Sequence, residues 1–406
     1  MLKVYHPEII KSSYGVRIQA VFEHSQKSDT LWYEVEEKYG EYLTDESADG
    51  FLVGLLFYAL KNGCDMEVLA PISQNLYYSI NNYLIPLLVK IHGYKRIRIK
   101  CNELLKEPIL SKGAVGTGLS CGIDSFATIV DHLDNSCPEE YKITHYTFFN
   151  VGSHGDNGGE KARKLFKERA EITKKYASEY GKEFISVDSN ISEVLQMNFK
   201  QTNTMRSLSA VLILQRLFKI YYYSAGVPIT RFKLTNDSTN SFDIFNMSML
   251  STETIRFFSS CPIMTRTEKT ELVSNYTPSY KYLNVCFFNK NNCGKCPKCL
   301  RTLLTLEIIG KIENYSNVFN LKAYYSNRKK YIATVLAERK SNKFSIEIYD
   351  NMLAKSFRIP LSSKVISIAY KTKNGFISKF TGKGRYTKIM NTWRGIYLRK
   401  DLHKYN

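Results

Sequence analysis

The segment Gly116-Thr117-Gly118-Leu119-Ser120-Cys121-Gly122-Ile123-Asp124-Ser125 joins a predicted strand at residues 115–119 to a predicted helix at residues 124–133. Small residues at this junction let the backbone approach a ligand closely. The first helical turn leaves N–H groups unpaired at the positive end of the helix dipole. The segment therefore predicts a site for phosphate groups.

Three side chains of this segment suit a phosphate site. Ser120 and Ser125 can donate hydroxyl hydrogen bonds, and Asp124 fits if Mg²⁺ accompanies the phosphates. No Gly-Lys-Ser/Thr follows, so the segment is not a Walker A loop, and it also lacks the dinucleotide-binding fingerprint. The alternative is an ordinary glycine-containing turn between a strand and a helix.

The order of predicted elements indicates an α/β fold. Around the loop, strands rich in Val, Ile and Phe alternate with amphipathic helices, which favours a doubly wound, mostly parallel sheet with helices on both faces. The predicted strands cover residues 115–119, 144–151, 183–187, 231–235 and 255–259, and the predicted helices cover residues 124–133, 159–180, 205–224 and 300–309. Residues 1–112 alternate in the same way and predict a separate N-terminal α/β domain.

The C-terminal residues differ in composition from the rest of the chain. Residues 311–406 hold 21 Lys+Arg against 5 Asp+Glu, which is +16 of the total charge of +19. Alternating patterns at residues 331–336, 344–349 and 365–370 predict a small β-rich module. We expect domains at residues 1–112, 113–310 and 311–406. The basic module either binds nucleic acid, binds another acidic partner or is an ordinary solvated surface, and these alternatives stay open.

Four cysteines gather within 14 residues, as Cys286, Cys293, Cys296 and Cys299. Four thiolates at this spacing are typical of a tetrahedral zinc site, and a closed shell of four sulfurs indicates a structural role. An iron–sulfur cluster is the alternative, because thiolates also hold iron. The chain has no segment typical of a secretory signal or a membrane span, so we expect a cytoplasmic protein.

The loop resembles the Ser-Gly-Gly-x-Asp-Ser loop of the PP-loop ATP pyrophosphatases, except that Cys121 replaces a glycine. Together with the cysteine cluster, it is similar to 7-cyano-7-deazaguanine synthase of the queuosine pathway. Lys269-Thr270-Glu271-Leu272-Val273 after Pro262, and Leu300-Arg301 after the last cysteine, agree with that family. The resemblance covers roughly residues 113–310.

This resemblance implies a PP-loop fold of the adenine nucleotide alpha-hydrolase type. It implies an ATP-dependent ligase that adenylates a carboxylate or carbonyl oxygen, releases pyrophosphate and lets a nucleophile displace AMP. The implied ATP-binding residues are Leu119, Ser120, Cys121, Gly122, Ile123, Asp124 and Ser125. The implied catalytic residues are Asp124, Ser125, Arg206 and Lys269, and the implied cofactors are ATP, Mg²⁺ and Zn²⁺.

The acceptor stays open, because residues 235–240 do not match the base-recognition segment of the family. A deazaguanine-like molecule and a group on a protein or RNA are the alternatives, and we expect a homo-oligomer or a complex. Two other functions remain. One is an RNA-modifying PP-loop enzyme of the tRNA thiolation type. The other is a zinc-stabilised nucleotide-binding module without turnover, for which Cys121 is the main indication.

Overall fold

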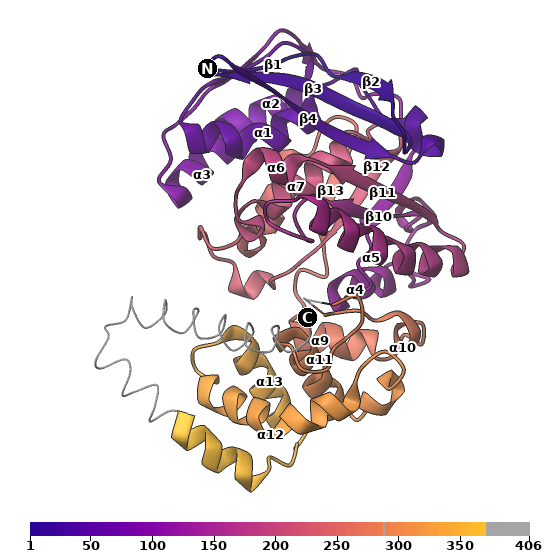
Figure 1. Cartoon of the computed structure of the whole chain (residues 1–406), viewed down its shortest axis with the longest axis vertical. Coiled ribbons are helices and arrows are strands. Elements are labelled where there is room, and N and C mark those ends of the chain that lie inside the picture. The colour runs from indigo at the N-terminus through magenta and orange to yellow at the C-terminus, as the bar shows by residue number, and fades with distance from the viewer. Residues whose placement is uncertain (287–288, 371–406) are drawn as a thin grey trace. The chain divides into compact units, whose positions relative to one another are not determined.

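The computed structural model describes residues 1–286 and 289–370 (Figure 1). The chain divides into two compact units, Met1–Asn291 and Asn292–Asn406, whereas the sequence predicted boundaries near residues 112 and 310. Strands from residues 1–112 share one sheet with strands from the following segment, so the first predicted boundary falls within a continuous sheet.

The first unit is an α/β structure with a mixed, largely parallel sheet, which confirms the α/β part of the predicted fold class. Its strands are β1 (Leu2–Val4), β2 (Glu8–Lys11), β3 (Val16–His24), β4 (Lys27–Val35), β5 (Met66–Val68), β6 (Ile72–Ser73), β7 (Ile99–Cys101), β8 (Leu104–Leu105), β9 (Ala114–Gly118), β10 (His145–Asn150), β11 (Glu183–Ser189), β12 (Phe218–Ser224) and β13 (Arg256–Ser260). Among the described residues the main sheet runs β13-β12-β9-β10-β11-β4-β3-β1-β5-β7, with β2 beside β3 and with β6 and β8 paired separately.

Helices connect these strands. They are α1 (Asp49–Asn62), α2 (Gln74–Ser79), α3 (Ile85–His92), α4 (Ile123–Asp131), α5 (Glu160–Glu179), α6 (Ile191–Leu195), α7 (Phe199–Leu212), α8 (Asp243–Leu250), α9 (Arg266–Val273) and α10 (Ser279–Tyr282). Shorter helical turns are η1 (Glu37–Tyr42), η2 (Ile80–Leu84), η3 (Glu139–Tyr141), η4 (Ile229–Arg231) and η5 (Thr239–Phe242).

The five strands β9 to β13 are mutually parallel and have a doubly wound order. From β9 the chain proceeds to β10 and β11 on one side, and then to β12 and β13 on the other side. The strand order therefore reverses between β9 and β12. In open parallel sheets, ligands bind outside the carboxyl ends of the strands at such a reversal. The predicted phosphate loop follows β9 at this edge.

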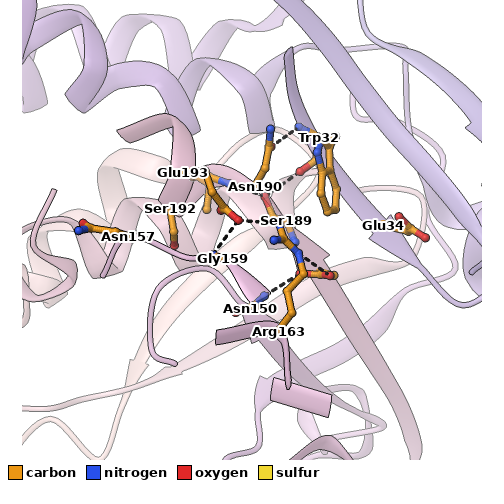
Figure 2. A network of polar contacts seen from close by, with 12 residues as sticks. Trp32, Glu34, Asn150, Asn157, Gly159, Arg163, Ser189, Asn190, Ser192 and Glu193 are labelled. Carbon is orange, nitrogen blue, oxygen red and sulfur yellow. Dashed lines mark hydrogen bonds and ion pairs between the residues drawn. The ribbon is translucent and has the colours of Figure 1, made fainter. Parts of the chain in front are cut away.

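The N-terminal strands extend the same sheet through an antiparallel pairing of β4 with β11. At this junction Trp32 lies beside Asn190 and Ser189 (Figure 2). The N–H of Trp32 donates to Oδ1 of Asn190 at 2.9 Å, and its carbonyl accepts from Oγ of Ser189 at 2.7 Å. The N-terminal residues are therefore hydrogen-bonded into the loop-bearing part of the sheet.

Helix α1 is buried along most of its length and packs against α7. Glycines on α1 allow close approach both to the end of α7, at Gly50, and to β4, at Gly54. A Cβ atom on Gly50 would lie 2.7 Å from Cγ2 of Ile213, and one on Gly54 would lie 2.7 Å from the hydroxyl of Tyr33. Figure 1 shows α1 beside the N-terminal strands, drawn in indigo.

Two predicted elements of the first unit are wrong. Residues 218–224, assigned to the end of a long helix, form β12, and residues 231–235, assigned to a strand, contain only the end of η4. A parallel strand buried on both faces has a continuous apolar sequence, which periodicity alone does not distinguish from a buried helix.

The second unit is helical over its described residues, so the predicted β-rich module is wrong there. It contains α11 (Pro297–Ile308), η6 (Ile312–Tyr315), α12 (Leu321–Glu338) and α13 (Lys343–Ala354), and residues 361–370 are also helical. The three predicted strands lie within α12, α13 and this last helix. The basic segment 371–406 lies outside the described residues. No described helix has the length and apolar character needed to cross a bilayer.

Candidate functional site at the carboxyl end of β9

The loop after β9 is held at both ends by backbone hydrogen bonds. The N–H of Leu119 donates to the carbonyl of Thr147 at 2.8 Å, and the carbonyl of Cys121 accepts from the N–H of Asn284 at 2.8 Å. Gly122 then caps α4 in an extended conformation. These contacts hold the first turn of α4 at the edge of the sheet, and the phosphate site predicted at this turn stays a prediction.

Cys121 occupies a backbone conformation that favours glycine. Its φ of 53° lies in the left-handed region. Its side chain is 1% exposed, and burial raises the pKa of the thiol well above its usual range. Cys121 therefore contributes its backbone to the loop, while its protonated thiol belongs to the interior.

The two loop serines hold each other and the helix start. Oγ of Ser120 accepts from the N–H of Gly122 at 3.3 Å and lies 3.4 Å from Oγ of Ser125. Ser125 donates to the carbonyl of Gly122 at 3.1 Å. Ser120 is exposed, whereas Ser125 is buried. Of the two hydroxyls, that of Ser120 is the one accessible to a ligand.

Asp124, in the first turn of α4, binds two cationic side chains of α9. Its Oδ2 lies 2.6 Å from Nη2 of Arg266, and its Oδ1 lies 3.8 Å from Nζ of Lys269. Oδ1 is buried and accepts no hydrogen bond from the described residues. Both carboxylate oxygens thus face a cation, and Oδ1 keeps its hydrogen-bonding capacity unused.

Lys269 connects Asp124 to a second carboxylate. Its ammonium group, which is buried, donates to the carbonyl of Ala225 after β12 at 2.6 Å. Its charge also acts on Asp243, at the start of α8, and lowers the pKa of that carboxyl. Burial outweighs this attraction and raises the pKa of Asp243 to about 7, although the backbone N–H groups of Gly226 and Ile244 also favour the carboxylate.

The hydrogen bonds described for Arg206 go to residues outside the loop. Its guanidinium group is fully buried and donates to Oγ of Ser192 at 3.1 Å. It also donates to three backbone carbonyls, those of Val151, Asp156 and Met197. Among the described residues, none of these partners belongs to the loop at residues 119–125. Through these contacts Arg206, within α7, is joined to α6 and to the segments that follow β10 and α6.

The four clustered cysteines come together in space, with all their sulfur atoms within 4.8 Å of one another. The cluster could hold a metal ion. Sulfurs about 2.3 Å from a tetrahedral zinc ion would be about 3.8 Å apart, and the sulfurs of Cys293 and Cys299 lie 4.0 Å apart. The N–H of Cys296 points to the sulfur of Cys293 at 3.3 Å, and the N–H of Cys299 to that of Cys296 at 3.5 Å.

Gly294 makes this turn possible. Its φ is 69°, and a Cβ atom there would lie 2.2 Å from the carbonyl oxygen of Asn320. Cys296 caps α11, so the cysteine turn and the helix form one local structure.

Two members of the candidate site, Arg266 and Asp243, were missed by the sequence reasoning. Arg266 lies in the first turn of α9, three positions before Lys269, so both side chains leave one face of the helix. That spacing was a usable signal. Asp243 had only the weak signal of an acidic residue at the start of a short helix.

Comparisons with models of protein families, with curated proteins and with solved structures found no match to this chain.

Proposed function

We propose that this protein binds Mg²⁺-ATP at the loop after β9 and transfers its AMP moiety to an oxygen of a carboxylate or carbonyl group. The observation that carries the proposal is the arrangement around Asp124. A helix-opening carboxylate, Arg266 and Lys269 meet at the edge of a parallel sheet where the strand order reverses. The resemblance of the loop to that of the PP-loop ATP pyrophosphatases supports the same function.

Each residue has a distinct task in this proposal. The N–H groups of the first turn of α4 and the hydroxyl of Ser120 bind the β- and γ-phosphates. Arg266 and Lys269 neutralise the negative charge that develops on the departing pyrophosphate. Oδ1 of Asp124, which accepts no hydrogen bond from the described residues, is the oxygen that we assign to Mg²⁺, a hard cation that prefers carboxylate ligands. The ion supplies further charge neutralisation when it is bound.

The acceptor oxygen must lie in line with the α-phosphate, which is a matter of positioning. We assign contact with the acceptor to the carboxyl of Asp243, whose pKa the charge of Lys269 lowers and burial raises. A nucleophile then displaces AMP from the adenylate. For the cysteine cluster we propose a structural zinc ion, because four sulfurs leave no open coordination position.

The proposal is tested by measuring release of pyrophosphate and AMP from Mg²⁺-ATP, with carboxylate acceptors of small-molecule, peptide and RNA origin. Asp124→Asn should lower pyrophosphate release by about 100-fold or more, because it removes charge at the site of transfer. The matched control is Asp134→Asn, an exposed carboxylate in the loop after α4. Normal turnover in Asp124→Asn would refute the site, and ATP binding without any turnover would favour the non-catalytic binding module.

A further inference from the structure

A groove of about 700 Å³ is lined by residues of α8 and β13, by the segment that joins them, by the first residues of β12 and by parts of α2 and η3. β13 is the terminal strand of the main sheet among the described residues. The groove offers apolar contacts from Met247 and Phe258 and charges from Lys219 and Glu253. This mixture of apolar and charged side chains suits an extended peptide better than it suits a purely apolar ligand.

The backbone of β13 faces this groove at alternate residues. The N–H of Phe257 donates to Oγ of Ser251 at 3.1 Å and so points away from β12. The carbonyl of Ser260 accepts from the N–H of Ala225, directly after β12, at 3.1 Å and so points toward β12. Because orientation alternates along a strand, the backbone groups of Ser259 point outward with those of Phe257.

The first half of this outer edge is already closed. The N–H of Ile255 donates to Oγ1 of Thr252 at 3.0 Å, and its carbonyl accepts from the N–H of Thr252 at 3.0 Å. Within the described chain, the carbonyl of Phe257 and both backbone groups of Ser259 have no hydrogen-bond partner. An open edge of this kind is a template for an added strand.

The open end of β13 leads to the candidate site. Oγ of Ser259 donates to Oδ1 of Asp243 at 3.4 Å. Asp243 is in turn within the electrostatic reach of Lys269, whose ammonium group lies 3.8 Å from Asp124. The open end of β13 thus lies beside a carboxyl group that is also influenced by the charge of Lys269 in the candidate site.

We propose that this groove binds an extended peptide as an additional strand parallel to β13, and that the peptide supplies the carboxylate that is adenylated. This inference rests on the proposed function. In parallel pairing, one peptide residue donates to the carbonyl of Phe257 and accepts from the N–H of Ser259. The peptide then runs toward the carboxyl ends of the strands, which brings its C-terminal carboxylate to the edge that carries Asp243 and Lys269.

The chemical step follows from this placement. A carboxylate oxygen of the peptide attacks the α-phosphorus of ATP and forms a new P–O bond. The bond between the α-phosphorus and the oxygen that bridges to the β-phosphate breaks, and its electron pair leaves with pyrophosphate. The products are a peptidyl adenylate and pyrophosphate, and nothing is oxidised or reduced.

Ser259→Pro is the decisive variant, because it removes the outward N–H and leaves the inward ladder to β12 in place. Ser259→Ala is its control, since it keeps the N–H and loses only the hydroxyl. Ser248→Trp is a second test, because Ser248 is an exposed residue of α8 that lines the groove and a large side chain there would fill it.

The probe is a mixture of N-acetylated random hexapeptides that lack Asp and Glu and end in a free carboxylate. Pyrophosphate release is measured with this mixture, with its C-terminally amidated counterpart and with random RNA hexamers. We expect the carboxylate mixture to stimulate release by the wild type and by Ser259→Ala. Loss of one hydrogen bond should lower the stimulation about tenfold in Ser259→Pro, and Ser248→Trp should lower it as well.

Three results would overturn the proposal: undiminished stimulation in both Ser259→Pro and Ser248→Trp, equal stimulation by the amidated peptides, or stimulation by RNA alone. Calorimetric titration with Mg²⁺-ATP tests the nucleotide site separately from the peptide groove. If ATP binds and no peptide stimulates release, the peptide groove is refuted and the nucleotide site stands. If the wild type does not bind ATP, both are refuted.

Discussion

Oδ2 of Asp124 and Nη2 of Arg266 lie 2.6 Å apart, although these residues belong to the first turns of two different helices, α4 and α9. The contact brings two positive helix ends and a guanidinium group to one point at the edge of the sheet. Asp124 offsets this charge within the folded chain. A phosphate ligand with its own Mg²⁺ would make the guanidinium group available for phosphate contacts.

Replacing Arg266 should weaken the binding of triphosphates specifically. Arg266→Met removes a charged donor, so the dissociation constant of Mg²⁺-ATP should rise by about tenfold or more. The affinity for adenosine should stay unchanged, because adenosine has no phosphate. Isothermal titration calorimetry with both ligands checks this, with the exposed Lys61→Met as control. An equal loss of affinity for adenosine would show that the effect is structural.

Asp243 should make folding stability depend on pH. Burial raises the pKa of its carboxyl from 3.8 to about 7. Between these values the folded state keeps a proton that the unfolded state has lost, so this group lowers stability as pH rises through this window, and its effect is constant above it. Asp243→Asn removes that dependence.

The free energy of unfolding of Asp243→Asn, relative to the wild type, should therefore increase from pH 5 to pH 7. The slope should be at most about 1.4 kcal/mol per pH unit. Urea unfolding at several pH values measures it, with the exposed Asp29→Asn as the matched control. A difference that does not change with pH would mean that Asp243 titrates near its ordinary pKa.

Arg206 should matter for stability more than for ATP binding. Arg206→Met would leave the carbonyls of Val151, Asp156 and Met197 without the donor that they share. We expect a loss of about 3 kcal/mol or more in the free energy of unfolding. The variant Arg96→Met, at an exposed arginine, should lose about 1 kcal/mol or less. A stable Arg206→Met protein that no longer binds ATP would restore Arg206 to the catalytic set.

Most of the correct predictions rest on short local patterns in the sequence. The loop after β9 and the cysteine turn are both specified by small residues or thiols at short spacing, so each could be located without knowledge of the packing. The contact of Asp124 with Arg266 could not be predicted, because it depends on how α4 packs against α9.

The errors at residues 218–224 and 331–336 share a cause, because an apolar run is compatible with both a buried strand and a buried helix. Residues 220–222 of β12 are buried in the parallel part of the sheet, and their apolar sequence looks like part of a helix. Residues 331–336 are rich in β-branched side chains and look like a strand. In α12 their buried members are Ile332, Ala333, Val335 and Leu336. Tertiary packing overrides their local preference for a strand.

Removal of one cysteine should release the metal and destabilise the protein together. Cys296→Ser should lower zinc, measured by plasma mass spectrometry, from about one ion per chain to a small fraction. Its free energy of unfolding should fall by several kcal/mol, because metal binding is coupled to folding. Cys137→Ser, outside the cluster, is the control. Iron with visible absorption in the wild type would contradict zinc, and a stable metal-free Cys296→Ser protein would contradict a structural role.

Cys121→Gly should preserve both the loop and its activity. The residue has a φ of 53°, which a glycine adopts without the penalty of about 1 kcal/mol that a side chain meets there. The thiol that would be lost is buried and protonated, because burial raises its pKa, so it is not a nucleophile near neutral pH. Pyrophosphate release by Cys121→Gly should remain within about threefold of the wild type, a change of under 1 kcal/mol in the barrier.

The burial of the Cys121 thiol also predicts that it reacts slowly with alkylating reagents. In the folded protein, iodoacetamide should modify the half-buried Cys137 well before Cys121, which peptide mass mapping can show. Rapid labelling of Cys121, together with a large loss of turnover in Cys121→Gly, would mean that the sulfur takes part in the chemistry. If labelling is slow and turnover is kept, Cys121 serves the loop through its backbone alone, as a glycine would. Its difference from the glycine of the PP-loop enzymes would then be no argument against catalysis.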